Sequence, residues 1–198
     1  MAEIGTGRKV GKNIRTLTLQ EIEQFIESIG EKKFRSKQIY EWLWLKQAHS
    51  FEAMTNLSKE LRARLTGQFT LPALTVDTTQ YSADGTIKSR FKTHDHHLVE
   101  GVLIPTESRQ TACVSSQIGC SLSCKFCATG YIEKKRNLDF DEIYDEVVLI
   151  NQQAERVYGK KLSNIVFMGM GEPLLNYKNV LRAIERITSP DGLGMSPR

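Results

Sequence analysis

The sequence has 198 residues, of which 40% are hydrophobic and 25% are charged, and its formal net charge is +4. No apolar run approaches the roughly 20 residues of a membrane helix, and no apolar stretch follows the basic N-terminus, so we expect a cytoplasmic protein with no membrane segment and no secretory signal. The basic excess lies within residues 1–70. Such an excess fits nucleic-acid contact, although charge alone favours an ordinary solvated helical surface.

The first third of the chain reads as helical. Residues 1–16 are polar and contain glycines, and we expect them to form a mobile tail. Thr18 and Glu21 have the spacing of a capping box at the start of a helix. Residues 17–72 are therefore predicted to be a small helical accessory domain. Its three helices are expected to begin near Thr18, Ser36 and Asn56.

From about Leu74 the apolar residues alternate with a period of two, which indicates β-strands. Ala83-Asp84-Gly85 predicts a hairpin turn. We expect residues 73–105 to form a β-rich connector and residues 106–198 to form the front part of a core domain. The predicted strands are 75–81, 86–93, 97–104 and 110–115.

The last third has the order of an α/β protein. After a polar, irregular stretch at 119–137, Asp139 and Glu142 predict a helix start, and a strand is predicted at 164–168. A second helix follows, on which Leu181, Ile184 and Ile187 align. Two such units begin a parallel α/β sheet or barrel but cannot close one, so we expect the front part of a longer protein.

Three of the four cysteines form a C-x3-C-x2-C motif: Cys120, Cys124 and Cys127. Three thiolates on one short loop can hold three irons of a 4Fe–4S cluster and leave the fourth iron without a protein ligand. S-adenosylmethionine can chelate that iron through its amino and carboxylate groups. An electron from the cluster can then cleave the cofactor and give a 5′-deoxyadenosyl radical.

Two other sites are possible for this motif. A structural zinc ion would need a fourth ligand, either Cys113 or one of His94, His96 and His97. A ferredoxin-like site would need a fourth cysteine at a tighter spacing. The observed spacing favours the open cluster.

A glycine-rich turn, Gly169-Met170-Gly171-Glu172-Pro173, follows the predicted strand at 164–168. Glycines there allow a ligand to approach the backbone closely, and Glu172 could neutralise a ligand ammonium group. Alone, such a turn is more often a tight connection. Its place one helix and one strand after the cysteine motif makes it a candidate clamp for the amino group of S-adenosylmethionine.

Two segments, ACVSSQIGCSLSCKFCATG at 112–130 and MGMGEPLLN at 168–176, resemble the RlmN family of radical-SAM methyltransferases. That family methylates C2 of an adenine in 23S rRNA and an adenine in some tRNAs. The resemblance implies an α/β fold: a small N-terminal helical domain, then the first βα units of a truncated radical-SAM partial (β/α) barrel. It implies a 4Fe–4S cluster and S-adenosylmethionine as cofactors. It also implies 23S rRNA, tRNA and an electron donor such as flavodoxin as partners of a monomer.

The resemblance assigns roles to matching positions. Cys120, Cys124 and Cys127 would be metal ligands, and Gly171 and Glu172 would bind S-adenosylmethionine. Cys113 matches the second catalytic cysteine, which forms a transient disulfide, and Glu100 matches the proposed proton acceptor. Without the resemblance these two would be a small buried strand residue and a half-exposed strand carboxylate. The methyl-carrying cysteine near the family's C-terminus has no counterpart, so we expect no turnover by this chain alone.

Three alternatives remain open: a Cfr-type enzyme that methylates C8 of the same adenine, a zinc-held RNA-binding module without catalysis, and a radical-SAM activase of a protein. Basic and aromatic residues suggest RNA contact, although we expect at least one of the two tryptophans to pack in the core. The candidates are Lys32, Lys33, Arg35 and Lys37 with Trp42 and Trp44, and Lys134, Lys135 and Arg136.

Overall fold

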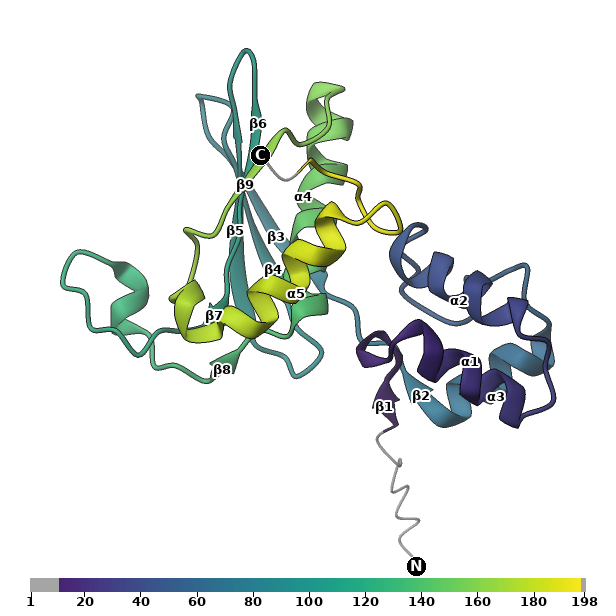
Figure 1. The fold of residues 1–198 in the computed structure, drawn as a ribbon. Coiled ribbons are helices and arrows are strands. Elements are labelled where there is room, and N and C mark those ends of the chain that lie inside the picture. Colours follow the sequence, from purple (N-terminus) through teal and green to yellow (C-terminus); the bar gives the residue numbers. More distant parts are fainter. Residues whose placement is uncertain (1–10, 197–198) are drawn as a thin grey trace, which may run out of the picture. The chain divides into compact units, whose positions relative to one another are not determined.

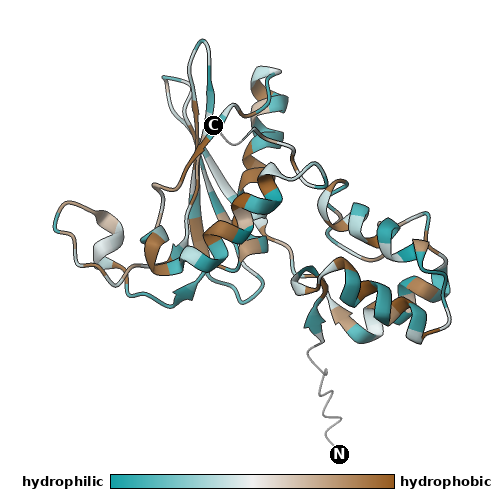
Figure 2. Ribbon diagram, in the orientation of Figure 1, coloured by the Kyte–Doolittle hydropathy of each residue, from teal (hydrophilic) through white to brown (hydrophobic). Residues whose placement is uncertain are grey.

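The computed structural model describes residues 11–196 (Figure 1). The chain divides into two compact units, with the boundary between Pro72 and Ala73. Each unit has its own buried core. Figure 2 shows that hydrophobic residues, drawn in brown, recur along the helices and strands of both units. No helix of the described part is long and apolar enough to cross a membrane.

The first unit consists of three helices around an apolar core. Thr18 and Glu21 form the predicted capping box, because each side chain accepts from the backbone N–H of the other residue. Trp44 is 1% exposed, which confirms that one tryptophan belongs to the core. The helices are α1 (Leu19–Ser28), α2 (Phe34–Trp44) and α3 (Lys59–Gln68), and a short parallel pair joins β1 (Lys12–Asn13) to β2 (Phe69–Thr70).

Two details of this unit differ from the sequence-based expectation. The mobile tail was expected to reach residue 16, but residues 12–13 pair with β2, and residues 14–16 form the 3-10 turn η1. The side chain of Ile14 is fully buried and anchors this stretch; residues 1–10 lie outside the described part. Helix α3 is capped by Ser58, whose Oγ accepts from Leu61 N at 3.1 Å. The expected cap, Asn56, instead accepts from Trp42 Nε1 at 2.5 Å.

The second unit is built on a mixed five-stranded sheet in the order β3-β4-β5-β6-β9. Four strands are antiparallel: β3 (Thr75–Tyr81), β4 (Ile87–Lys92), β5 (Leu98–Pro105) and β6 (Gln110–Cys113). The last, β9 (Asn164–Val166), runs parallel to β6. The segment at 73–105, predicted to be a β-rich connector, contributes its strands to the same sheet as the strands that follow, because β5 and β6 are hydrogen-bonded neighbours.

Two helices pack in this unit. Helix α4 (Phe140–Tyr158) begins at the predicted capping box of Asp139 and Glu142 and packs against β5 and β6, while α5 (Tyr177–Thr188) packs against α4 (Figure 1). On α5, however, Leu181 is 59% exposed, and the buried residues are Val180, Ala183 and Ile187. Two 3-10 turns complete the unit, η2 (Ala128–Tyr131) and η3 (Pro173–Asn176).

The sheet has one covered and one open face. On β5, Val99, Gly101 and Leu103 are buried, whereas Glu100 and Val102 between them are partly exposed. Successive side chains of a strand point to opposite faces. The face that carries Glu100 and Val102 is therefore the open one, and the described strands do not close into a barrel.

Candidate functional site

The three-cysteine loop is closed at its base by a small antiparallel ladder. Strands β7 (Gln117–Ile118) and β8 (Arg136–Asn137) pair on either side of it. Backbone hydrogen bonds continue the ladder, from Lys135 N to Ile118 O at 2.8 Å and from Cys120 N to Ile132 O at 3.2 Å. The loop between these strands, here called the cysteine loop (residues 119–135), projects from the end of the sheet (Figure 1). At its tip Phe126 is 93% exposed.

The backbone of the cysteine loop favours the thiolate form of Cys127. The N–H groups of Thr129 and then Gly130 point at the sulfur of Cys127 and hold its pKa below the usual range of a thiol. Leu122 N donates to Cys120 Sγ at 3.4 Å. The thiolate is the form that binds a metal, and N–H donors to sulfur are typical of iron–sulfur sites. All four cysteines are free, so the predicted ligands are available.

The cysteines are not arranged around a single ion. Thiolates bound to one tetrahedral zinc ion lie about 4 Å apart. In the described part of the chain, one group of three ligand atoms lies within 4.8 Å of one another, and it consists of His94, Asp95 and Glu142, without any cysteine. The sulfur atoms of Cys120, Cys124 and Cys127 are not gathered at the spacing of a tetrahedral zinc site in this structure.

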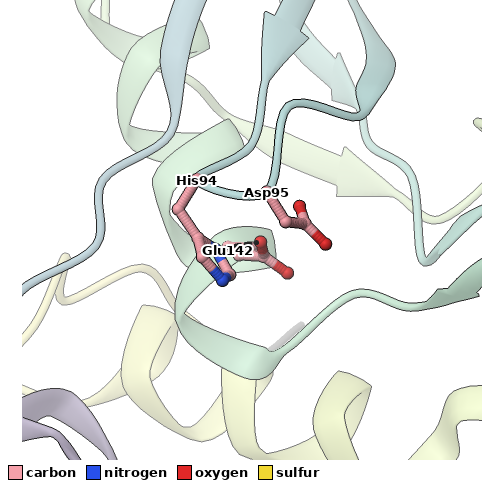
Figure 3. A group of neighbouring side chains, drawn as sticks. All are labelled: His94, Asp95 and Glu142. Atoms are coloured by element: carbon pink, nitrogen blue, oxygen red, sulfur yellow. Dashed lines mark ion pairs between the residues drawn. The ribbon is translucent and has the colours of Figure 1, made fainter. Parts of the chain in front are cut away.

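The group of His94, Asp95 and Glu142 is an ion-pair network rather than a metal site. Figure 3 shows His94 and Asp95 on the turn between β4 and β5, with Glu142 of α4 beside them. Arg136 donates to both oxygens of Asp95, at 2.7 and 2.8 Å, and to both oxygens of Glu142, at 2.6 and 2.8 Å. The guanidinium therefore supplies the positive charge. Arg136 was predicted to contact RNA with Lys134 and Lys135; in the structure its guanidinium is engaged by both carboxylates.

The glycine turn is hydrogen-bonded to the segment that leads into the cysteine loop. Gly169 N donates to Val114 O at 3.0 Å, Met170 N to Ser115 Oγ at 2.8 Å, and Glu172 N to Gln117 Oε1 at 2.9 Å. The backbone of Gly171 has φ +91°, and a Cβ there would lie 2.4 Å from Gln117 Cβ. Glycine is thus required at 171 both by conformation and by space. The glycine turn therefore lies beside the segment that enters the cysteine loop, although the two are distant in sequence.

The other two predicted residues lie on the open face of the sheet. Cys113 of β6 is directly opposite Val102 of β5, and Glu100 is two residues from Val102. Paired residues of antiparallel strands share a face, so Glu100 and Cys113 do as well. The Glu100 carboxylate is ion-paired with Lys88 Nζ at 2.8 Å. Burial, and to a smaller extent the nearby Glu146 carboxyl, raises the pKa of the Cys113 thiol, so this thiol carries its proton at neutral pH.

Sequence reasoning missed several buried polar residues around the site. Ser115, Gln117 and Asn176 are at most 4% exposed, and their side chains bond the segment of residues 115–117 to the glycine turn and to the residues that follow it. Glu146 on α4 is fully buried and accepts from Ser115 N at 2.9 Å. The available signal was the polar run Ser115-Ser116-Gln117 next to a strand. Its partners lie 31 to 60 residues away, so no local pattern identifies them.

Known proteins match both units. Residues 12–71 match the family model of the ribosomal RNA large subunit methyltransferase N-terminal domain, and residues 114–195 match the radical SAM superfamily. Proteins of Christiangramia forsetii and Cytophaga hutchinsonii, each named probable dual-specificity RNA methyltransferase RlmN, are 57% and 58% identical over 187 residues. These matches cover 94% of this chain and 53% and 51% of the relatives. The crystal structure of a radical SAM methyltransferase from Sphaerobacter thermophilus has a TM-score of 0.81 at 38% identity, over 94% of this chain and 55% of that one.

The α/β sheet, the cysteine loop and the adjoining glycine turn define a radical SAM protein. Within that superfamily the chain belongs to the RlmN family of RNA methyltransferases. It spans about half the length of the curated relatives it matches. Membership of the superfamily implies a 4Fe–4S cluster and S-adenosylmethionine as cofactors.

Proposed function

We propose that this chain is the cofactor-binding part of an enzyme that adds a methyl group to C2 of an adenine in 23S rRNA and in tRNA. The observation that carries the proposal is the hydrogen-bonded attachment of the glycine turn to the segment that enters the cysteine loop. This attachment supports one site for a cluster and for a cofactor bound beside it. When bound, the cluster supplies the electron that cleaves S-adenosylmethionine reductively.

Five residues hold the cofactors in this proposal. Cys120, Cys124 and Cys127 ligate three irons, supported by the lowered pKa of Cys127 and by the single loop that carries all three. Gly171 lets S-adenosylmethionine approach the backbone, and the Glu172 carboxylate pairs with its ammonium group. Glu172 is half-buried at the end of the turn, and its Oε1 accepts from Leu174 N at 3.0 Å, which orients the carboxylate.

Glu100 and Cys113 act on the RNA base. Their shared position on the open face supports a role for both beside one adenine that lies over the sheet. The base must leave its stack to reach such a site. Glu100 takes the C2 proton, and Lys88 keeps its carboxylate on the open face. Cys113 starts as a protonated thiol because of its raised pKa, and its transient disulfide would form only later in the cycle.

The first unit contributes RNA contact. Lys32 and Lys37 are exposed, whereas Lys33 pairs with Glu23 at 2.9 Å and Arg35 donates to Asn56 O at 3.1 Å. The two exposed lysines are therefore the better phosphate ligands of the predicted set. The name of the relatives favours the C2 reaction over the Cfr-type C8 reaction. The cytoplasmic location, the monomeric state and a flavodoxin-like electron donor remain predictions.

The test is anaerobic reconstitution of the chain with iron and sulfide, followed by electron paramagnetic resonance (EPR) of the reduced protein with and without S-adenosylmethionine. We expect a cubane signal that shifts when the cofactor is added. Alanine at Cys120, Cys124 or Cys127 removes the signal, while the matched control Cys113→Ala keeps it. Zinc in place of iron, or a cluster lost equally in Cys113→Ala, would contradict the proposed ligand set.

A further inference from the structure

Gln117 is a polar side chain with no exposed surface, three residues before the first cysteine of the loop. Both ends of its amide group are used. Its Oε1 accepts from Glu172 N at 2.9 Å, and its Nε2 donates to Asn137 Oδ1 at 2.8 Å. Asn137 is its partner in the ladder between β7 and β8. One side chain on the entry strand of the cysteine loop thus contacts both the exit strand and the glycine turn.

The glycine turn also rests directly on the body of this side chain. A Cβ at Gly171 would approach Gln117 Cβ at 2.4 Å and Cγ at 2.6 Å, so the turn backbone packs where any larger residue would clash. Met170 O accepts from Ser116 N at 2.9 Å and from Gln117 N at 3.2 Å. Close packing and five hydrogen bonds, counted with those from Gly169 N, Met170 N and Glu172 N, therefore define the distance between the turn and the segment that enters the loop.

A second set of hydrogen bonds lies shortly after the turn, at residues 175 and 176. Asn176 Nδ2 donates to Ser116 O at 2.7 Å and to Leu138 O at 2.8 Å, and this residue is 4% exposed. Asn137 Nδ2 donates to Leu175 O at 3.3 Å. The turn itself is thus bonded to residues 114–117, and the two residues 175 and 176, shortly after it, are bonded to Asn137 of β8 and to the residues that adjoin the ladder. A ligand that bridges the loop and the turn would find the spacing already set, which lowers the entropic cost of binding.

We infer that Gln117 is the positioning residue that fixes the Glu172 carboxylate relative to the cluster formed on Cys120, Cys124 and Cys127. This inference rests on the proposed function, because it takes Glu172 to bind the ammonium group of S-adenosylmethionine. The position requires glutamine because it needs one acceptor, for Glu172 N, and one donor, for Asn137 Oδ1. Methionine has nearly the same shape but offers neither, and glutamate loses the donor and adds a buried negative charge near Glu172.

The substitution to test is Gln117→Met, with Gln153→Met as the matched control. Gln153 is a similarly buried glutamine, 4% exposed, whose Nε2 donates to Ser89 Oγ on β4 at 2.7 Å. The first measurement is amide hydrogen exchange, by mass spectrometry, of peptides covering residues 168–176 in the metal-free chain. We expect about tenfold faster exchange of the turn in Gln117→Met, since one hydrogen bond to Glu172 N is lost, and no change there in Gln153→Met.

The second measurement uses the reconstituted chain. We expect Gln117→Met to keep the iron content and the EPR signal of the unvaried chain, but to need about tenfold more S-adenosylmethionine for half of the cofactor-induced shift. A merely structural role would lower iron content and stability without moving that concentration. Should Gln117→Met fail to fold, Asn137→Ala, which removes the partner of Gln117 Nε2 at a half-buried position, must give both effects in the same direction.

The outcomes separate the two proposals. Unchanged exchange at residues 168–176 in Gln117→Met overturns the positioning role, whatever the cluster does. Faster exchange with an unchanged cofactor concentration also overturns it, because the turn would then move without consequence for binding. A cluster in the unvaried chain that ignores the cofactor counts against the proposed function instead, and the exchange result still decides whether Gln117 holds the turn.

Discussion

Arg136 and Asp95 are 41 residues apart, yet the guanidinium donates from Nε to Asp95 Oδ2 at 2.7 Å and from Nη2 to Asp95 Oδ1 at 2.8 Å. The same guanidinium also bonds Glu142 at the start of α4. The hydrogen bonds from Arg136 hold the pKa of Asp95 far below the usual range. The exit strand of the cysteine loop is thereby fixed to the β4–β5 turn and to α4.

Removal of this guanidinium should destabilise the second unit. In Arg136→Met the two carboxylates lose their shared partner, and we expect the free energy of unfolding to fall by about 2 kcal/mol. Urea unfolding at neutral pH measures the change. The control is Lys135→Met, because Lys135 pairs with Glu133 on the exposed surface, where we expect a change of roughly 0.5 kcal/mol or less. Equal losses in both variants would show that the network adds nothing beyond a surface pair.

The buried carboxyl of Glu146 should make the stability of the chain depend on pH. Burial, and secondly the Glu142 carboxylate, raises the pKa of Glu146 well above its usual range, partly opposed by the hydrogen bond from Ser115 N. As the pH rises above the pKa that Glu146 has in the unfolded chain, the unfolded state loses a proton that the folded state retains. The free energy of unfolding therefore falls until the pH passes the pKa of Glu146 in the folded chain. Glu146→Gln keeps an acceptor for Ser115 N and avoids this loss. We expect it to be more stable than the unvaried chain at pH 8, by a margin that disappears near pH 4.

Thermal unfolding across this pH range measures the Glu146 effect. An exposed carboxyl, Glu107, offers the control, since Glu107→Gln changes no buried group. A stability difference for Glu146→Gln that does not depend on pH would mean that the pKa of Glu146 is the same in the folded and the unfolded chain.

RNA affinity should depend on the two exposed lysines of the first unit. We expect Lys32→Glu with Lys37→Glu to weaken binding of a short 23S rRNA hairpin and to reduce its salt dependence, because two phosphate contacts are lost. The matched control reverses the charge at two exposed positions of the second unit, with Lys160→Glu and Lys161→Glu. Lys33 and Arg35 are left in place, since their bonds to Glu23 and Asn56 O support the fold. Unchanged affinity in the first variant would remove this patch from the RNA surface.

Gly171→Ala should lower the free energy of unfolding by more than backbone strain alone would. Both Gly171 and Gly159 have positive φ, +91° and +63°, but a Cβ at Gly159 meets no atom within 4 Å. Gly159→Ala therefore costs about 1 kcal/mol of unfolding free energy, whereas Gly171→Ala also displaces Gln117. We expect the larger loss for Gly171→Ala, together with a weaker response of the cluster to S-adenosylmethionine. Chemical unfolding and EPR titration measure the two effects, and equal unfolding losses would contradict the packing of Gly171 on Gln117.

Local signals determined much of this protein from its sequence. Capping boxes act over three residues, so Thr18 with Glu21 and Asp139 with Glu142 marked the starts of α1 and α4 correctly. The hairpin turn at Gly85 is local for the same reason. The spacing of the cysteines likewise predicted one loop that carries three thiols. In each case the interacting atoms are a few residues apart, and their pattern is written in the chain.

Tertiary structure alone decided how those parts meet. Arg136 follows two lysines and looked like part of an RNA-binding surface, but Asp95, which engages it, is 41 residues away. The local sequence did not identify Gln117, because the group that donates a hydrogen bond to its Oε1, Glu172 N, is 55 residues away. Leu181 fits an apolar stripe of α5 but is exposed, since the direction of the stripe depends on the neighbouring helix. Hydrogen bonds and packing between distant segments have no sequence period, so only the folded chain reveals that the glycine turn is bonded to the segment that enters the cysteine loop.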